Sequence, residues 1–340
     1  MRSLLRSVLV ARLAPLAALA ALSACGSSSD PAGADAAAVP AGDAAPGSID
    51  AAADRADGGA SIDAGALACP DAADAFPTWI RGGPDCDGEP AIQVHRYDRD
   101  TFILRQSLCT SFEGPFLYLL FGEDRVLLED TGDGGIPIAD TVLEIIDQVL
   151  AERGQASIEL VVVHSHGHGD HTGGDAQLEG LPGVILVGTE IAAVQDFFGI
   201  ASWPDDAATL DLGGRVLDVV PVPGHQGADI ALHDRRDGLL LTGDTLYPGR
   251  LYIRDFTDYR ASIARLDRLA AERGVCFVLG AHVEMSITPG EDYEMGASFH
   301  PDEHPLALGR SALVELGAAL DAMGDRPTFE VHDDFIVYPL

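Results

Sequence analysis

The sequence predicts a layered α/β fold, and two observations lead to that prediction. Short apolar runs of strand length alternate with apolar residues at helical spacing over about 270 residues, from near residue 69 onwards. Polar residues gather where several of these runs end, as they do in domains that stack helices against sheets. A chain of 340 residues has ample length for such a core, in one large domain or two small ones.

The first half of this region reads as three strands, a helix and a buried strand. Strands are expected over 101–107, 115–121 and 125–129, and Asp130-Thr131-Gly132 closes the last of them. The run 158–163 is expected to be a buried strand. A helix is expected between them, because apolar residues recur at helical spacing before Gly154: Ile138, Val142, Ile145, Ile146 and Val149.

The same alternation continues to the end of the chain. A loose succession of strands and helices is visible, with no other internal repeat. The apolar patterns predict the following strands: 184–187, 215–220, 230–233, 239–241, 275–279 and a closing strand over 328–338. They predict three helices: 190–198, 257–272 and 305–322.

The first 24 residues have the features of a secretory signal, with Arg2 and Arg6 before an apolar run. Its end, Leu22-Ser23-Ala24-Cys25, resembles the lipobox of bacterial lipoproteins, which implies cleavage before Cys25 and a lipid on that cysteine. The protein is therefore expected to be an exported outer-membrane lipoprotein that faces the periplasm or the cell surface. Cleavage at a plain Ala-x-Ala type site, which leaves Cys25 unmodified, is the alternative.

The segment 25–68 is expected to be a disordered tether to a folded domain over 69–340. It consists almost entirely of Ala, Gly, Asp, Ser and Pro, and it cannot bury enough apolar surface to offset the entropy of ordering.

Four cysteines follow Cys25, and an exported protein can form disulfides. Cys276 lies inside an apolar strand pattern and is expected to be a buried thiol. A bridge is therefore expected among Cys69, Cys86 and Cys109, although four cysteines allow three complete pairings.

The charge of the chain excludes some partners. Its 54 acidic and 21 basic residues give a formal net charge of -33. Binding to nucleic acid needs a basic surface, so no nucleic-acid partner is expected. Attachment to anionic lipid by charge alone is also disfavoured, which leaves the lipid at Cys25 as the membrane contact.

The stretch 164–171 carries the strongest chemical signal. It reads His-Ser-His-Gly-His-Gly-Asp-His and directly follows the buried run 158–163, so these side chains sit where a strand becomes a loop. Glycines in and after it allow the backbone to turn sharply. Neutral imidazoles and carboxylates are the ligands that zinc and similar cations prefer.

Three more polar residues lie at expected strand ends downstream: His225, Asp244 and His282. Together with His166-x-His168-x-Asp170-His171, their order and spacing resemble the signature of the metallo-β-lactamase (MBL) superfamily, over roughly residues 92–285. Asp130 matches that family's early aspartate motif and is expected to hold the histidine loop by hydrogen bonds. The resemblance implies an αββα four-layer sandwich with the site at the edge where its two sheets meet.

The resemblance also implies a dinuclear metal centre. One cation would be bound by His166, His168 and His225, and the other by Asp170, His171 and His282, with Asp244 bridging both. A bridging hydroxide would attack the substrate. Zinc is the expected metal, and Fe or Mn suits the same mixed ligands.

Departures from the family pattern narrow the expected reaction. Asp244 stands where zinc β-lactamases resemble one another in carrying Cys or Ser, which disfavours β-lactam hydrolysis. The sequence looks most like the glyoxalase II and lactonase branch, which implies a small-molecule ester, lactone or thioester as substrate. Asp170 and Tyr247 are the expected catalytic residues, as proton donor and oxyanion partner. Arg250 and Arg254 are the local candidates for an anionic substrate.

Two other classes of function remain open. One is a mononuclear iron enzyme that resembles the persulfide dioxygenases of the superfamily. The other is a non-catalytic metal-binding surface module.

Overall fold

The computed structural model describes residues 67–340. The expected signal 1–24 and almost all of the tether 25–68 lie outside the described residues, so both stay predictions. Within residues 67–340, none of the helices combines the length and the apolar character that spanning a bilayer requires.

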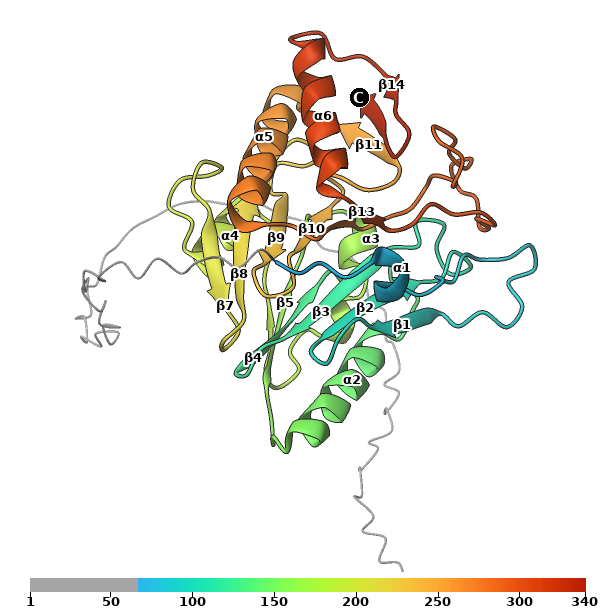
Figure 1. The fold of residues 1–340 in the computed structure, drawn as a ribbon. Coiled ribbons are helices and arrows are strands. Elements are labelled where there is room, and N and C mark those ends of the chain that lie inside the picture. The colour runs from blue at the N-terminus through green and yellow to red at the C-terminus, as the bar shows by residue number, and fades with distance from the viewer. Residues whose placement is uncertain (1–66) are drawn as a thin grey trace, which may run out of the picture. The chain divides into compact units, whose positions relative to one another are not determined.

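Two six-stranded sheets form the middle of the fold (Figure 1). The first has the strand order β1 (Ile92–Arg96), β2 (Thr101–Gln106), β3 (Phe116–Phe121), β4 (Arg125–Glu129), β5 (Glu159–Val163), β6 (Val184–Leu186). The second has the order β13 (Ala307–Leu308), β12 (Phe277–Gly280), β10 (Leu239–Gly243), β9 (Ile230–Asp234), β8 (Val216–Pro221), β7 (Ala208–Asp211).

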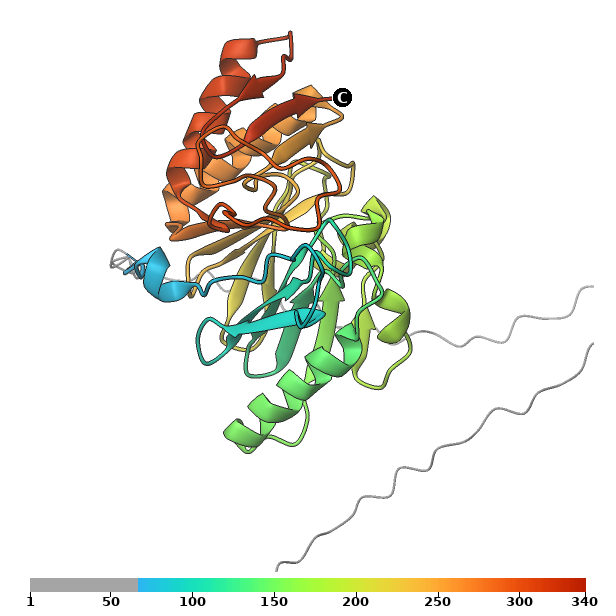
Figure 2. The ribbon, with the colours of Figure 1, turned by 90° about the vertical axis from the view of Figure 1, so that its right-hand side faces the viewer.

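Helices cover the outer face of each sheet (Figures 1 and 2). Helix α2 (Ile138–Arg153) packs its apolar stripe on the first sheet, against residues such as Leu117 and Leu119. Helices α5 (Phe256–Arg273) and α6 (Arg310–Met323) pack on the second sheet. The remaining helices are short: α1 (Ala72–Ala75), α3 (Gly169–Thr172) and α4 (Ile191–Phe198), with a 3₁₀ turn at Asp175–Gln177.

The core between the sheets follows from the alternation of side chains along each strand. In β3, Leu117 and Leu119 face α2, whereas Phe116, Tyr118 and Leu120 face the second sheet. Strands that are buried on both faces read as continuous apolar runs. The layers are therefore helix, sheet, sheet and helices, which confirms the predicted αββα sandwich.

Several elements differ from their predictions. The expected closing strand over 328–338 is a hairpin of β14 (Glu330–Val331) and β15 (Ile336–Pro339), because the chain turns between His332 and Phe335. Strand β15 pairs with β11 (Arg250–Ile253) in a third, three-stranded sheet. The expected helix over 305–322 begins only at Arg310, since Ala307 and Leu308 pair with β12. Strands β1, β7 and β11 had not been predicted.

The disulfides correct one prediction. Cys86 and Cys109 form the bridge expected among the first three cysteines. Cys276, predicted to be a buried thiol, is bonded instead to Cys69, 207 positions away. Cys276 lies just before β12, at a half-buried position that the N-terminal segment reaches.

Candidate metal centre

The two sheets meet at one edge, where strands β5, β8, β10 and β12 deliver the predicted ligands. Strand β10 is parallel to β12, with Leu241 opposite Leu279, so Asp244 and His282 leave the sheet side by side. The loop of residues 164–171 leaves β5 on the other sheet. The backbone N–H of Ile230 donates to Ser165 O (2.9 Å) and joins this loop to the second sheet.

Asp130 fixes the histidine loop. It follows β4, and its carboxylate accepts hydrogen bonds from Ser165 N–H (2.8 Å), Ser165 Oγ–H (2.8 Å) and His171 Nδ1–H (2.8 Å). Asp130 is only 2% exposed. Burial alone would raise its pKa, but the imidazoles of His171 and His164 lower the pKa well below the usual range. The ionised carboxylate therefore orients the loop and one of the proposed ligands.

A first cluster gathers ring nitrogens of three histidines around one oxygen of Asp244. His168 Nδ1 lies 2.8 Å from His166 Nε2 and 3.0 Å from His225 Nε2. Asp244 Oδ2 lies 3.7 Å from His166 Nε2 and 3.5 Å from His225 Nε2. His168 is the one histidine here that turns Nδ1, and not Nε2, towards the common centre.

A second cluster gathers around the other oxygen of the same carboxylate. Asp244 Oδ1 lies 3.2 Å from His282 Nε2 and 3.5 Å from His171 Nε2. Asp170 Oδ2 lies 3.3 Å from each of these two nitrogens. All seven predicted ligands thus lie in two groups whose potential ligand atoms are within 4.8 Å of one another, and Asp244 belongs to both.

These spacings fit metal cations. A tetrahedral cation with ligand bonds of about 2.0–2.1 Å needs ligand atoms about 3.3 Å apart. The five contacts of the second cluster span 3.2–3.5 Å. Asp244 Oδ1 is buried and accepts no hydrogen bond from the part of the chain that the structure describes. Such an oxygen is costly to bury unless something else binds it, and a cation would do so.

The outward nitrogens of four ligand histidines are held by acceptors in the protein. The Nδ1–H of His282 donates to Glu113 O (2.8 Å) and that of His225 donates to Tyr252 O (2.8 Å). His171 Nδ1 is held by Asp130, and His166 Nδ1 lies 3.2 Å from Ser165 Oγ. A proton on Nδ1 leaves the lone pair of Nε2 directed at the centre, as metal binding requires.

The pKa shifts of the predicted ligands indicate that the two clusters need positive charge beside their carboxylates. Burial lowers the pKa of His166 well below its usual value, and the nearby His171 adds to this. Burial would raise the pKa of Asp244, but the imidazoles of His282 and His171 lower it well below the usual range. Burial would lower the pKa of His171 and His282, yet the neighbouring carboxylates raise both well above their usual values. Ionised carboxylates buried here need positive charge beside them, which either protons on these imidazoles or metal cations supply.

A cavity of about 260 Å³ opens onto both clusters. Four residues of its wall are not among the site residues predicted from the sequence: Glu113, Tyr252, Glu284 and Leu340. They come from loops and from the third sheet, where no local pattern marks them. Burial raises the pKa of the Glu113 carboxyl to about 7.

The remaining predicted residues differ in their placement. Tyr247 lines the cavity with its ring edge-on to His282, but it is only 2% exposed and its hydroxyl donates to Arg250 O (2.5 Å). The guanidinium of Arg250 pairs with Glu284 (3.1 Å) and Asp292 (2.7 Å) and does not line the cavity. Arg254 lines the cavity and is exposed.

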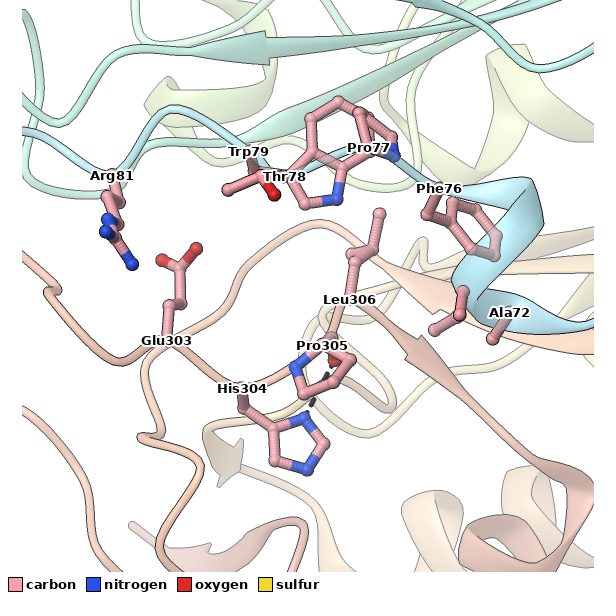
Figure 3. Close-up of a pocket in the computed structure, with 12 residues that line it drawn as sticks. Ala72, Phe76, Pro77, Thr78, Trp79, Arg81, Glu303, His304, Pro305 and Leu306 are labelled. Carbon is pink, nitrogen blue, oxygen red and sulfur yellow. Dashed lines mark hydrogen bonds between the residues drawn. The ribbon is translucent and has the colours of Figure 1, made fainter.

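A second, more apolar cavity of about 350 Å³ lies between residues 72–81 and 303–307 (Figure 3). Phe76, Trp79 and Leu306 form its apolar wall, and Arg81 and Glu303 lie at one end. None of the seven predicted ligands lines this larger cavity, whereas five of them line the smaller one.

Comparison with known proteins identifies relatives. A family model described as "Metallo-beta-lactamase superfamily" matches residues 112–282. A hydroxyacylglutathione hydrolase from Aeromonas salmonicida is 33% identical over 140 residues, which are 41% of this chain and 49% of the relative. The acyl-coenzyme A thioesterase MBLAC2 of Gallus gallus is 27% identical over 204 residues, 50% of this chain and 72% of the relative.

The similarity to solved structures is weaker in sequence identity than the similarity to these relatives. A metallo-beta-lactamase from Pontibacter korlensis is 19% identical and has a TM-score of 0.45, with 68% of this chain and 99% of that chain covered. The chain spans about half to two-thirds of the length of the first curated relatives that it matches.

Proposed function

The chain belongs to the metallo-beta-lactamase superfamily, and we propose that it is a dinuclear metal-dependent hydrolase that cleaves an acyl bond of a small molecule, in an ester, lactone or thioester. The observation that carries the proposal is the Asp244 carboxylate, which turns one oxygen to each of two ligand clusters. The names of the relatives, a hydroxyacylglutathione hydrolase and an acyl-coenzyme A thioesterase, favour acyl chemistry over other reactions of the superfamily.

Seven residues of the chain would bind two cations, in two groups that share Asp244. His166, His168 and His225 would hold one, Asp170, His171 and His282 the other, and Asp244 both. When bound, the cations would polarise the substrate carbonyl and lower the pKa of water towards neutrality. Zinc suits these ligands best, and Fe or Mn remains compatible with them.

Asp170 is the residue that we propose moves the proton. Its carboxylate lines the cavity beside the His171 and His282 imidazoles. Burial alone would raise its pKa, but the hydrogen bonds and the charge of these two imidazoles together lower the pKa well below the usual range. An ionised carboxylate has no proton to give, so Asp170 would first accept one from the hydrolytic water and then pass it to the leaving group.

Tyr247 was predicted to be the oxyanion partner, but we propose a positioning role for it, because its hydroxyl is already engaged. Its hydroxyl proton is engaged by Arg250 O. The Tyr247 hydroxyl can donate to a substrate oxygen only if its hydrogen bond to Arg250 O is broken. Without such an exchange, Tyr247 acts as a positioning residue, through its ring against His282 and its hydrogen bond to β11.

Export and attachment to the outer membrane through a lipid at Cys25 belong to the same proposal. They rest on the sequence of residues 1–25 alone. Such an anchor would place the hydrolase among exported or extracellular small molecules.

The proposal is tested by measuring metal content and turnover together. Purified wild-type protein should retain two equivalents of divalent metal and hydrolyse at least one member of a panel of homoserine lactones, aryl esters and S-lactoylglutathione. Nitrocefin and bis-para-nitrophenyl phosphate serve as reference compounds for β-lactam and phosphodiester cleavage. The variant His168→Ala should lose metal and turnover in parallel, because it removes a nitrogen of the first cluster.

Other results identify the alternatives. Turnover that persists with one metal or none would refute the dinuclear mechanism. Oxygen uptake with sulfite formation would instead indicate an iron dioxygenase. Full metal content without turnover of any compound would indicate a non-catalytic module.

A further inference from the structure

Within residues 67–340, His168 is the one proposed ligand histidine whose outward nitrogen faces no acceptor. The outward nitrogens of His225, His282 and His171 face Tyr252 O, Glu113 O and the Asp130 carboxylate. His168 Nε2 instead lies 3.5 Å from Nη2 of Arg254. Among residues 67–340 this guanidinium is its one hydrogen-bonding neighbour.

That contact joins two donors. His168 directs Nδ1 at the cluster centre, 2.8 Å from His166 Nε2, so its neutral ring carries the proton on Nε2 when Nδ1 binds a cation. A guanidinium has only donors. The Nε2–H and the Nη2–H groups therefore cannot bond each other, and a third group that accepts from both would satisfy them.

The charges around the cavity point to an anionic acceptor. Four carboxyl-bearing residues, Glu113, Asp170, Asp244 and Glu284, line it together with one guanidinium, that of Arg254. Arg250 is already paired with Glu284 and Asp292, whereas Arg254 forms no ion pair within the described chain. On a chain of net charge -33, an anion is repelled at long range and needs a local cation to be bound.

We propose that Arg254 and the Nε2–H of His168 form an anion subsite that binds a carboxylate of the substrate next to the scissile acyl bond. The subsite rests on the proposed hydrolase function and gives it a substrate class, acyl compounds that carry a carboxylate a few bonds from the carbonyl. The planar guanidinium suits a carboxylate because it can donate to both oxygens. One ring would thus serve the metal through Nδ1 and the substrate through Nε2.

A matched pair of esters tests the specificity. The mono-para-nitrophenyl ester of glutaric acid and the para-nitrophenyl ester of pentanoic acid have the same acyl length and differ in the terminal carboxylate. In Arg254→Gln the ratio of kcat/KM for the anionic over the neutral ester should fall about 10- to 100-fold, the effect of losing a hydrogen bond between charged groups. Arg268→Gln on α5 removes the same charge from an exposed side chain outside the cavity and should keep the wild-type ratio.

A binding measurement gives a readout that does not depend on turnover. Isothermal titration calorimetry on the zinc-loaded protein would use a methyl ketone with a terminal carboxylate and the uncharged methyl ketone of equal length, neither of which can be hydrolysed. Wild type and Arg268→Gln should bind the anionic ketone more tightly, and Arg254→Gln should lose that preference. Arg254→Lys should retain part of it, since the charge stays and the two-pronged geometry is lost.

The outcomes separate this inference from the function on which it rests. An unchanged preference in Arg254→Gln, in both esters and ketones, overturns the anion subsite while leaving a hydrolase. If wild type cleaves neither ester, the calorimetry still decides: an Arg254-dependent preference supports the subsite, and equal binding of the two ketones overturns it.

Discussion

The substitution Asp130→Asn tests how the metal centre is organised, because it alters one atom of a residue that touches no proposed cation. Asp130 has a positive φ of 65°. Asn tolerates this conformation as well as Asp does, and the two side chains have nearly the same volume. The backbone after β4 should therefore be preserved, and the change confined to the hydrogen bonds of the carboxylate.

The geometry around residue 130 gives the expected magnitude. Asp130 Oδ1 accepts from Ser165 N–H, and Oδ2 accepts from Ser165 Oγ–H and His171 Nδ1–H, each at 2.8 Å. An amide has one oxygen, so it can keep the Ser165 N–H or the His171 Nδ1–H but not both. If it keeps the backbone bond, its NH₂ group faces His171 and moves the ring proton to Nε2, the nitrogen that faces Asp244. Loss of such an outer partner weakens metal binding about 10- to 100-fold, or about 1.4–2.7 kcal/mol.

The assay is a zinc titration of metal-free protein against a competing chelating indicator. Asp130→Asn should weaken one of two sites, the one that contains His171, and change the other far less. Asp211→Asn is the matched control, because it makes the same chemical change at the exposed end of β7, where among residues 67–340 the carboxylate accepts only from Gly213 N–H. Two sites of wild-type affinity in Asp130→Asn would refute the reasoning, since the ring orientation would then not depend on this carboxylate.

Three further predictions concern catalysis and stability. Tyr247→Phe should lower kcat less than about tenfold, because its hydroxyl is engaged by a backbone carbonyl; a fall of 10²–10³ would identify it as an oxyanion donor. Arg215→Met should destabilise the fold by about 3–5 kcal/mol in denaturant unfolding, because it leaves the fully buried Asp234 without its partner at 2.6 Å; a loss below about 1 kcal/mol would contradict this. Cys86→Ser should cost about 3 kcal/mol by the same measurement, as expected for a loop of 23 residues closed by Cys109, and an unchanged midpoint would count against it.

The parts of the fold and site that the sequence could predict are those with a local pattern. The continuous apolar run before His164 marked a strand buried on both faces, and it is β5. Asp244 and His282 lie side by side because strand β10 runs parallel to β12, and neighbouring parallel strands end at the same edge. Asp130 was expected to hold the histidine loop by hydrogen bonds, and its three contacts have that geometry.

What the sequence could not predict depends on contacts between distant segments. Tyr252 and Leu340 reach the cavity through the pairing of β11 with β15, whose residues Ile253 and Pro339 are far apart in the chain. The pairing of Cys69 with Cys276 has the same origin, since an apolar pattern around Cys276 says nothing of which segment covers that strand. The strand expected over 328–338 became a hairpin because β15 pairs on both sides, with β11 and β14.

The division of ligands between the sheets links metal binding to the fold itself. The loop after β5 in the first sheet supplies His166 and His168 to one cluster and Asp170 and His171 to the other; the second sheet supplies the rest. Each cation would therefore join two ligands from one sheet to two from the other, with Asp244 counted in both.

Direct hydrogen bonds already join the sheets at this edge, from Phe116 N–H to Ala281 O (2.8 Å) and from Tyr118 Oη–H to Gly280 O (2.6 Å). Because the unfolded chain cannot hold these ligands together, metal binding would stabilise the docked sheets by about 2.7 kcal/mol per site at a free metal concentration of about one hundred times Kd. The same cations would also neutralise carboxylates that are costly to bury, so metal binding would complete the proposed hydrolase site and stabilise this edge of the fold together.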